Sequence, residues 1–197
     1  MGCAAPHTAA RSGTFARSSL TSKNSPPILP PIESNVLSNT AAEQARDKLD
    51  AVFVGNIEKI ELPIANESLD LILCLDVLEH LVDPWRVLTR LRAYLKPGGA
   101  LIASIPNVRN RKVLLPLLFK GKWEYTEAGI LDRTHLRFFV RDSAIRLLES
   151  AGLKVDMVHA TGLGQSRSSR VVNALLPGWL RSFFEYQYLI RGIKTGP

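Results

Sequence analysis

The sequence predicts an α/β protein with a doubly wound, mostly parallel sheet, and three observations support this prediction. Residues 71–75 and 100–105 are apolar at nearly every position, which is typical of strands buried on both faces under covering helices. A helical pattern with apolar positions on one face separates the two runs. Polar residues, Asp76 and Asn107, follow the runs directly. Ligands bind beyond the carboxyl ends of strands in such sheets, so these residues mark the expected site.

Residues 1–40 differ from the rest of the chain. They are rich in Ser, Thr, Ala and Pro and lack the periodicity of a helix or strand, so we expect an irregular or disordered segment. An acid-poor start containing Arg and Ser is also typical of an organelle transit peptide, and this alternative stays open. The predicted domain comprises residues 41–197.

Ordered elements are predicted from Thr40 onward. Thr40 and Glu43 have the spacing of a capping box. Asp83, followed by a proline, is typical of a helix N-terminus, and either Asp142 or Ser143 is expected to cap a later helix. Strands are expected at 51–54, 69–75, 100–105, 153–159 and 186–193. Helices are expected at 41–49 and 84–95, and a third helix ends at 151. The connections are a loop at 61–68, a turn at 96–99, a long irregular lid-like connection at 109–139 and a loop with a short helix at 168–184.

Composition excludes several classes of protein. No apolar run approaches the roughly 18–20 residues of a membrane span. Cys3 and Cys74 lie in unrelated contexts, so we expect no disulfide and a reducing, cytoplasmic compartment.

The net charge is +7, and residues 161–197 hold five basic residues and one acidic residue. This tail is either a solvated basic face or a contact for an acidic surface, but no nucleic-acid-binding motif is present, so no specific nucleic acid is expected.

Several segments together resemble the class I S-adenosylmethionine-dependent methyltransferases, especially the branch that acts on small molecules. The resemblance covers roughly residues 41–193. The matching segments are residues 70–84, with the run Leu75-Asp76-Val77-Leu78-Glu79-His80, and residues 95–101, 104–107, 129–139 and 148–153.

This resemblance implies a Rossmann-like sheet of seven strands whose last strand is antiparallel and lies beside the fifth. The five predicted strands correspond to the third through seventh strands of the family. In the family, the first strand ends in a glycine-rich turn that approaches the cofactor, and the second ends in an acid that binds the ribose. Residues 1–40 show no strand followed by such a turn, so the fold is expected to be incomplete at the N-terminus.

The resemblance also implies S-adenosylmethionine as the cofactor. Leu75 and Asp76 would line its methionine part, and Asn56 and Ile57 would lie beside the adenine. His80 would lie near the transferred methyl group, either as the base that takes a proton from a hydroxyl acceptor or as part of the pocket wall.

The acceptor is expected to be a small molecule or a glycan-like compound, methylated on oxygen. Asp132, His135 and Arg137 would cover it, with Arg137 holding a carboxylate or phosphate or pinning the lid. No metal is expected, because His80 and His135 do not form a ligand pair at helix spacing, and the sequence does not indicate an oligomeric state. The alternatives are an inactive methyltransferase-like binding module or truncated fragment and, less favoured without a G-x-G-x-x-G turn after a strand, a nucleotide-dependent oxidoreductase.

Overall fold

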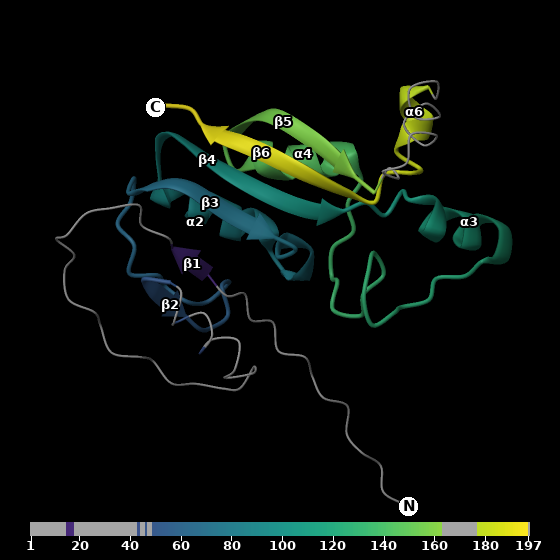
Figure 1. Ribbon diagram of the computed structural model, residues 1–197, viewed down its shortest axis with the longest axis horizontal. Helices are drawn as coiled ribbons and strands as arrows, with labels where there is room; N and C mark the ends of the chain where they lie inside the picture. The colour runs from purple at the N-terminus through teal and green to yellow at the C-terminus, as the bar shows by residue number, and fades with distance from the viewer. Residues whose placement is uncertain (1–14, 18–42, 44–45, 47–48, 163–176, 197) are drawn as a thin grey trace, which may run out of the picture. The chain divides into compact units, whose positions relative to one another are not determined.

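The computed structural model describes residues 15–17, 43, 46, 49–162 and 177–196 (Figure 1). The chain divides into two compact units, Met1–Pro63 and Ile64–Pro197. Each unit is described by itself below. The assignment of residues 41–197 to one domain stays a prediction.

The first unit contains a short antiparallel pair of strands. β1 (Phe15–Arg17) pairs with β2 (Ala51–Phe53), with Phe15 opposite Phe53. Residues 15–17 therefore form a strand that their local composition does not indicate, because pairing with a distant segment creates it. Glu43 and Arg46 are helical, as expected. Thr40, the rest of residues 1–40 and the transit-peptide alternative lie outside the described residues.

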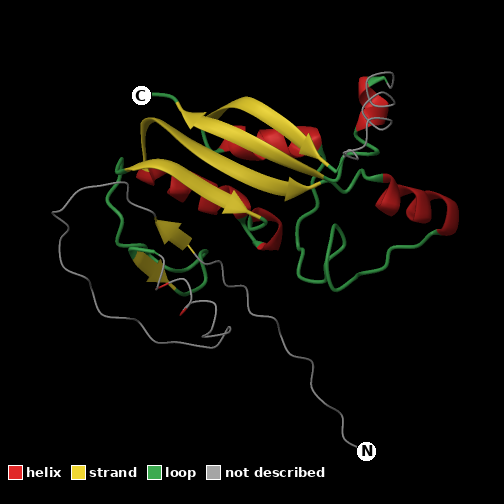
Figure 2. Ribbon diagram, viewed as in Figure 1, coloured by secondary structure: helices red, strands yellow, loops and turns green. Residues whose placement is uncertain are grey.

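The second unit is built on a mixed sheet in the order β3-β4-β6-β5 (Figure 2). β3 (Leu69–Leu75) and β4 (Leu95–Pro106) are parallel. β6 (Gln187–Lys194) runs antiparallel to both β4 and β5 (Leu153–Thr161), between which it lies. The prediction of an antiparallel last strand beside the fifth strand of the family is confirmed.

Two helices cover one face of this sheet (Figure 2). α2 (Pro84–Tyr94) begins after Asp83, whose carboxylate accepts a hydrogen bond from the Arg86 amide at 3.0 Å, as the sequence predicts. α4 (Arg141–Ser150) begins two or three residues earlier than expected, with Val140 as its N-cap. The predicted cap at Asp142 or Ser143 is wrong because Ser143 lies inside the first turn, where its hydroxyl accepts from the Val140 amide at 3.0 Å.

The opposite face of the sheet is partly exposed at β3. Leu71, Leu73 and Leu75 are 50–51% exposed, whereas Ile72 and Cys74 are buried on the face that α2 and α4 cover. The prediction that both faces of this strand are buried is therefore wrong. Among residues 64–162 and 177–196, no helix covers the side on which the three leucines lie.

The connection after β4 contains a helix that the sequence analysis did not predict. α3 (Arg111–Lys120) begins after Asn110, whose side chain accepts from the Lys112 amide, and ends at Gly121 in the left-handed conformation. The expected turn at residues 96–99 is a bulge within β4, since Leu69 pairs with Leu95 but Leu71 pairs with Ala100. The expected short helix near the C-terminus is α6 (Gly178–Arg181).

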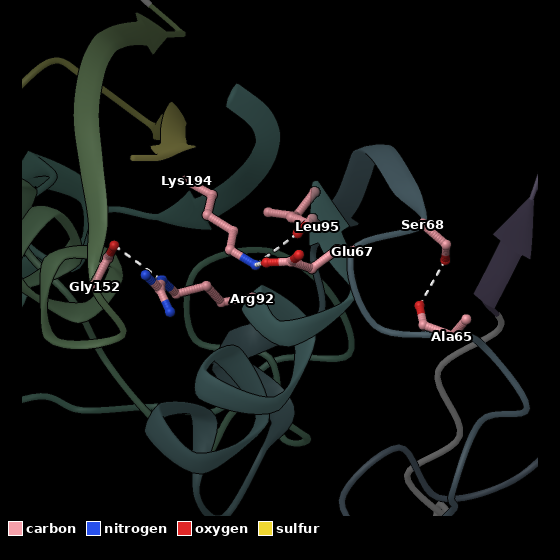
Figure 3. A network of polar contacts seen from close by, with 7 residues as sticks. All are labelled: Ala65, Glu67, Ser68, Arg92, Leu95, Gly152 and Lys194. Carbon is pink, nitrogen blue, oxygen red and sulfur yellow. Dashed lines mark hydrogen bonds and ion pairs between the residues drawn. The ribbon is translucent and has the colours of Figure 1, made fainter. Parts of the chain in front are cut away.

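A buried lysine ties the end of β6 to the start of the β3–β4 pair (Figure 3). Lys194 is 7% exposed, and its ammonium group donates to the Leu95 carbonyl at 2.8 Å and to the Glu67 carboxylate at 3.0 Å. Nearby, the Arg92 guanidinium of α2 donates to the Gly152 carbonyl at 3.1 Å. A buried charge is stabilising only when it keeps such partners.

Replacing Lys194 with methionine is expected to lower the free energy of unfolding by about 1–3 kcal/mol, because a buried carbonyl then loses its donor. Urea denaturation of the two proteins measures this difference. Lys154→Met on the exposed part of β5 is the matched control, and equal midpoints for Lys194→Met and the parent chain would refute a stabilising role.

Candidate active site

The carboxylate of Asp76, at the carboxyl end of β3, is held by side chains of β4 and β6. Its amide donates to the Ser104 hydroxyl of β4 at 2.8 Å, and that hydroxyl donates to Oδ1 of Asp76 at 2.9 Å. The Gln187 side chain of β6 also donates to Oδ1. Asp76 has a φ of 53°, in the left-handed region that Asp adopts more readily than most residues. Both side-chain bonds use Oδ1, so Oδ2 is the oxygen that can accept from a ligand.

The short 3₁₀ helix η1 (Leu78–His80) lies just beyond Asp76. The carbonyl of Glu79 accepts hydrogen bonds from the amides of Leu136 and Arg137, at 2.8 and 3.0 Å. These main-chain bonds join η1 to a loop that lies more than fifty residues later in the chain. The structure therefore brings His80 together with Asp132 and His135, three residues that the sequence analysis placed in one site.

A chain of hydrogen bonds orients the imidazole of His80. The Thr134 hydroxyl donates to Oδ1 of Asp132 at 2.6 Å, because a carboxylate oxygen can only accept. Nδ1 of His80 lies 3.0 Å from that hydroxyl and 3.2 Å from the Thr134 carbonyl. Since the carbonyl can only accept, we assign the proton of the neutral ring to Nδ1. Nε2 then keeps its lone pair, as a general base requires.

The charges around this chain favour an ionised Asp132. Burial by itself would raise the pKa of Asp132, but the hydrogen bonds from Thr134 and the proximity of His135 and His80 together lower it below the ordinary value. Thr134 was not among the residues singled out from the sequence. Its spacing of two from Asp132 is typical of an aspartate turn, and its amide also donates to Oδ1 of Asp132 at 2.7 Å.

His135 is buried beside His80. The two rings meet edge to face with centroids 4.7 Å apart, and Nδ1 of His135 donates to the Ile130 carbonyl at 3.0 Å. Burial lowers the pKa of His135, and the neighbouring His80 lowers it further. His135 is therefore a neutral ring near pH 7, and its bond to Ile130 holds it in one tautomer beside His80.

The side chain of Glu79 is buried without a hydrogen-bond partner. It is 1% exposed, and neither carboxyl oxygen has a partner among the described residues. Burial, with a smaller contribution from the charge of Asp76, raises the pKa of Glu79 to about 8. Its carboxyl oxygen and ring nitrogens of His80 and His135 all lie within 4.8 Å of one another. Such a set of ligand atoms could hold a divalent cation, although no metal was expected from the sequence.

Other polar and aromatic residues near the site hold the loop after α3 in place. Nε and Nη2 of Arg137 donate to the Val82 carbonyl, and the guanidinium lies over the Trp85 ring at 5.6 Å. Trp123 packs edge to face on Phe138. These contacts support the alternative, left open above, in which Arg137 pins the loop.

Asn107, at the end of β4, is fully buried and has a structural role. Its amide nitrogen donates to the carbonyls of Ser182 and Glu185, at 2.7 and 2.9 Å, and its side-chain oxygen accepts from the Arg109 amide at 3.0 Å. The side chain that follows the second apolar run therefore joins β4 to the segment before β6.

Asn56 and Ile57 belong to the first compact unit. The side-chain oxygen of Asn56 accepts from the Glu58 amide at 2.8 Å and forms a turn after β2. Ile57 is buried. Their assignment to the adenine is a prediction from the resemblance alone.

The sheet and the residues beyond it define a class of protein. A last strand inserted antiparallel beside the fifth, with an acid, a glutamate and a histidine after a parallel strand, is the arrangement of a class I S-adenosylmethionine-dependent methyltransferase domain. The chain belongs to this family, since the profile of the methyltransferase domain matches residues 12–158. The family uses S-adenosylmethionine as its cofactor.

Curated relatives include two enzymes named ubiquinone biosynthesis O-methyltransferase. The one from Cereibacter sphaeroides is 35% identical over 105 residues, which cover 52% of this chain and 41% of the relative. The one from Coxiella burnetii is 33% identical over 97 residues, which cover 44% of this chain and 40% of the relative. The chain thus spans about two fifths of the length of these relatives.

Solved structures show the same fold. A methyltransferase from Thermotoga maritima, described as a possible histamine N-methyltransferase, has a TM-score of 0.53 at 24% identity and covers 80% of this chain and 70% of its own. A methyltransferase from Archaeoglobus fulgidus has a TM-score of 0.54 at 18% identity, with 77% and 71% covered. At these identities the likeness establishes the architecture and not the acceptor.

Glu79 is expected to make stability depend on pH. The folded protein holds the proton of Glu79 up to a pH of about 8, whereas the unfolded chain releases it near the ordinary value of 4.5. The free energy of unfolding therefore falls as pH rises through this window, by on the order of 3 kcal/mol between about pH 5 and 8. Glu79→Gln lacks this carboxyl, so its stability relative to the parent chain should increase with pH.

Urea denaturation at several pH values measures this difference, and Glu149→Gln on the exposed side of α4 is the control. A constant difference between Glu79→Gln and the parent chain would show that Glu79 is ionised in the folded protein throughout this range.

Proposed function

We propose that the protein transfers a methyl group from S-adenosylmethionine to a hydroxyl group of a small-molecule or glycan-like acceptor. Family membership supports the cofactor, and the names of the curated relatives support oxygen as the accepting atom. The observation that carries the proposal is the hydrogen-bonded chain from Asp132 through Thr134 to His80. We also keep the cytoplasm as the predicted location.

The cofactor supplies an already activated methyl group when it is bound, so the protein has to align the acceptor, exclude water and remove one proton. Nε2 of His80 is the group that takes the proton from the acceptor hydroxyl. The imidazolium that forms donates from Nδ1 to Thr134, which is bonded in turn to the ionised Asp132. These bonds hold the ring in one orientation, so Thr134 and Asp132 are positioning residues for the base.

The residues of the second unit fit the methionine part of the cofactor. That part carries a sulfonium and an ammonium, which are both positively charged. Asp76 is exposed, and the hydrogen bonds that its carboxylate accepts from Ser104 and Gln187 both use Oδ1, so Oδ2 remains for the ligand. Leu75 beside it is half exposed and apolar. Asn56 and Ile57 are assigned to the adenine, and His135, Asp132 and Arg137 to the wall that covers the acceptor.

We propose this reaction without a metal. The Nδ1 bonds of His80 and His135 leave both Nε2 atoms available either to a proton or to a cation. A general base needs a nitrogen that is free to take a proton and is not bound to a cation. Activity that survives a chelator is the expected result, and loss of activity with EDTA that returns with a divalent cation would assign Glu79, His80 and His135 to a cation instead.

Asp76→Asn is expected to weaken binding of S-adenosylhomocysteine about tenfold or more, because the carboxylate that would pair with the ammonium is lost. Isothermal titration of the full chain measures the dissociation constant, which we expect to be micromolar for the parent protein, as is usual for such cofactors. Asp70→Asn is the control, since Asp70 is exposed and paired with Lys96. Absence of heat with the parent chain at millimolar ligand would favour the alternative of an inactive binding module.

His80→Ala is expected to lower kcat by about 10²–10⁴-fold while the affinity for S-adenosylhomocysteine stays within about twofold, because the base acts only on the acceptor. Turnover is followed as cofactor consumption with a panel of phenolic and sugar hydroxyl acceptors. Equal turnover in the variant would remove the base assignment.

Thr134→Val tests the positioning role separately. The variant keeps the volume of the side chain but cannot link His80 to Asp132, so kcat should fall about tenfold while the affinity for S-adenosylhomocysteine stays within about twofold. Thr134→Ser keeps the hydroxyl and should retain most of the activity, so an equal loss in both variants would indicate a merely structural role for this threonine.

A further inference from the structure

α3 presents large apolar side chains to solvent. Leu118 and Phe119 are each 75% exposed, and Leu115 is 44% exposed. These three residues have the spacing i, i+3 and i+4, so they form one stripe along the helix. Of the ten residues of α3, only Val113 is buried. The exposed apolar surface is contiguous, which in soluble proteins marks an interaction surface.

The helix projects from the end of the sheet. Figure 1 shows α3 beyond the carboxyl end of β4, away from the sheet and from α2 and α4. Its first turn is attached, because the Arg111 amide donates to the Phe183 carbonyl at 2.8 Å and the Asn110 side chain donates to the Glu185 carbonyl at 2.9 Å. The second half, where Leu118 and Phe119 lie, is the part that extends into solvent.

Most charged residues around the stripe are basic. Residues 109–123 contain five basic residues and no acidic residue. Lys112 and Lys120 are exposed near the two ends of α3, and Lys122 follows directly. Lys122 forms an exposed ion pair with Glu124 at 3.2 Å, which water largely screens.

We propose that α3 docks on a membrane surface that contains anionic phospholipids. Leu115, Leu118 and Phe119 would enter the boundary between headgroups and acyl chains, and the lysines would lie among the anionic headgroups, as in other interfacial amphipathic helices. A second copy of this chain is the weaker candidate, because a self-interaction through α3 would bring two basic segments together. None of the described helices is both long and apolar enough to cross a bilayer, so the contact proposed is with the surface.

The test uses the full chain and sedimentation with lipid vesicles. We expect binding to vesicles of equal parts phosphatidylcholine and phosphatidylglycerol, weaker binding to phosphatidylcholine alone, and release as salt is raised. The double variant Leu118→Ser, Phe119→Ser should reduce the partition coefficient at least about tenfold. Lys112→Glu with Lys120→Glu should abolish the preference for the anionic vesicles. Because all four side chains are exposed, the variants should fold, and circular dichroism checks that they do.

Two controls separate the proposal from a general loss of apolar or basic surface. Leu71→Ser removes a half-exposed leucine from β3, and Lys59→Glu reverses an exposed charge in the first unit. Both should bind vesicles like the parent chain. Equal binding by the Leu118, Phe119 double variant, or no binding of the parent chain to either vesicle, would overturn the proposal. So would a self-association of the parent chain, seen by analytical ultracentrifugation, that the double variant loses while vesicle binding stays unchanged.

Discussion

The site depends on two main-chain hydrogen bonds that the carbonyl of Glu79 accepts from Leu136 and Arg137. η1 follows directly from the end of β3, and the loop arrives after a connection that contains a helix of its own. Together with the bonds from the Arg137 side chain to the Val82 carbonyl, the two main-chain bonds place Thr134 against His80 and bring the ring of His135 edge to face with it. These two bonds use only main-chain atoms, so the side chains of η1 and of the loop remain available to contact a ligand.

The same contact explains the unusual environment of Glu79. Its main chain has to lie where the loop can reach it, which carries its side chain into the interior beside Cys74. Burial also raises the pKa of the Cys74 thiol to about 12, which keeps it protonated and unreactive. A carboxyl in such surroundings is neutral near pH 7, which avoids placing an unpaired charge next to His80. A functional site thus tolerates a buried polar group that an ordinary core would exclude.

Much of this arrangement was accessible from the amino-acid sequence, and the parts that were not have physical reasons. The apolar runs and the Asp83 cap define β3, β4 and α2 because they are local signals. α3 was missed although Asn110 and Gly121 bound it, because Pro116 and a stripe of leucines without a polar face obscure the helical period. The exposure of Leu71, Leu73 and Leu75 was also missed, since an apolar run does not reveal whether helices cover one face or two. His80, Asp132 and His135 could be proposed for one site from the sequence, and they lie close together, but the contact of Thr134 with the imidazole of His80 was visible only in three dimensions.

The bond from Gln187 to Asp76 joins residues 111 positions apart in the sequence. β6 supplies that glutamine and lies between β4 and β5, so it can pair only after both neighbours exist. Contacts of such long separation are slow to form, because the intervening chain must be ordered before they add any stability. During synthesis on a ribosome, the carboxylate at the tip of β3 therefore stays incompletely ordered until β6 has emerged. An unfinished chain would expose its hydrophobic strands before it could hold a ligand.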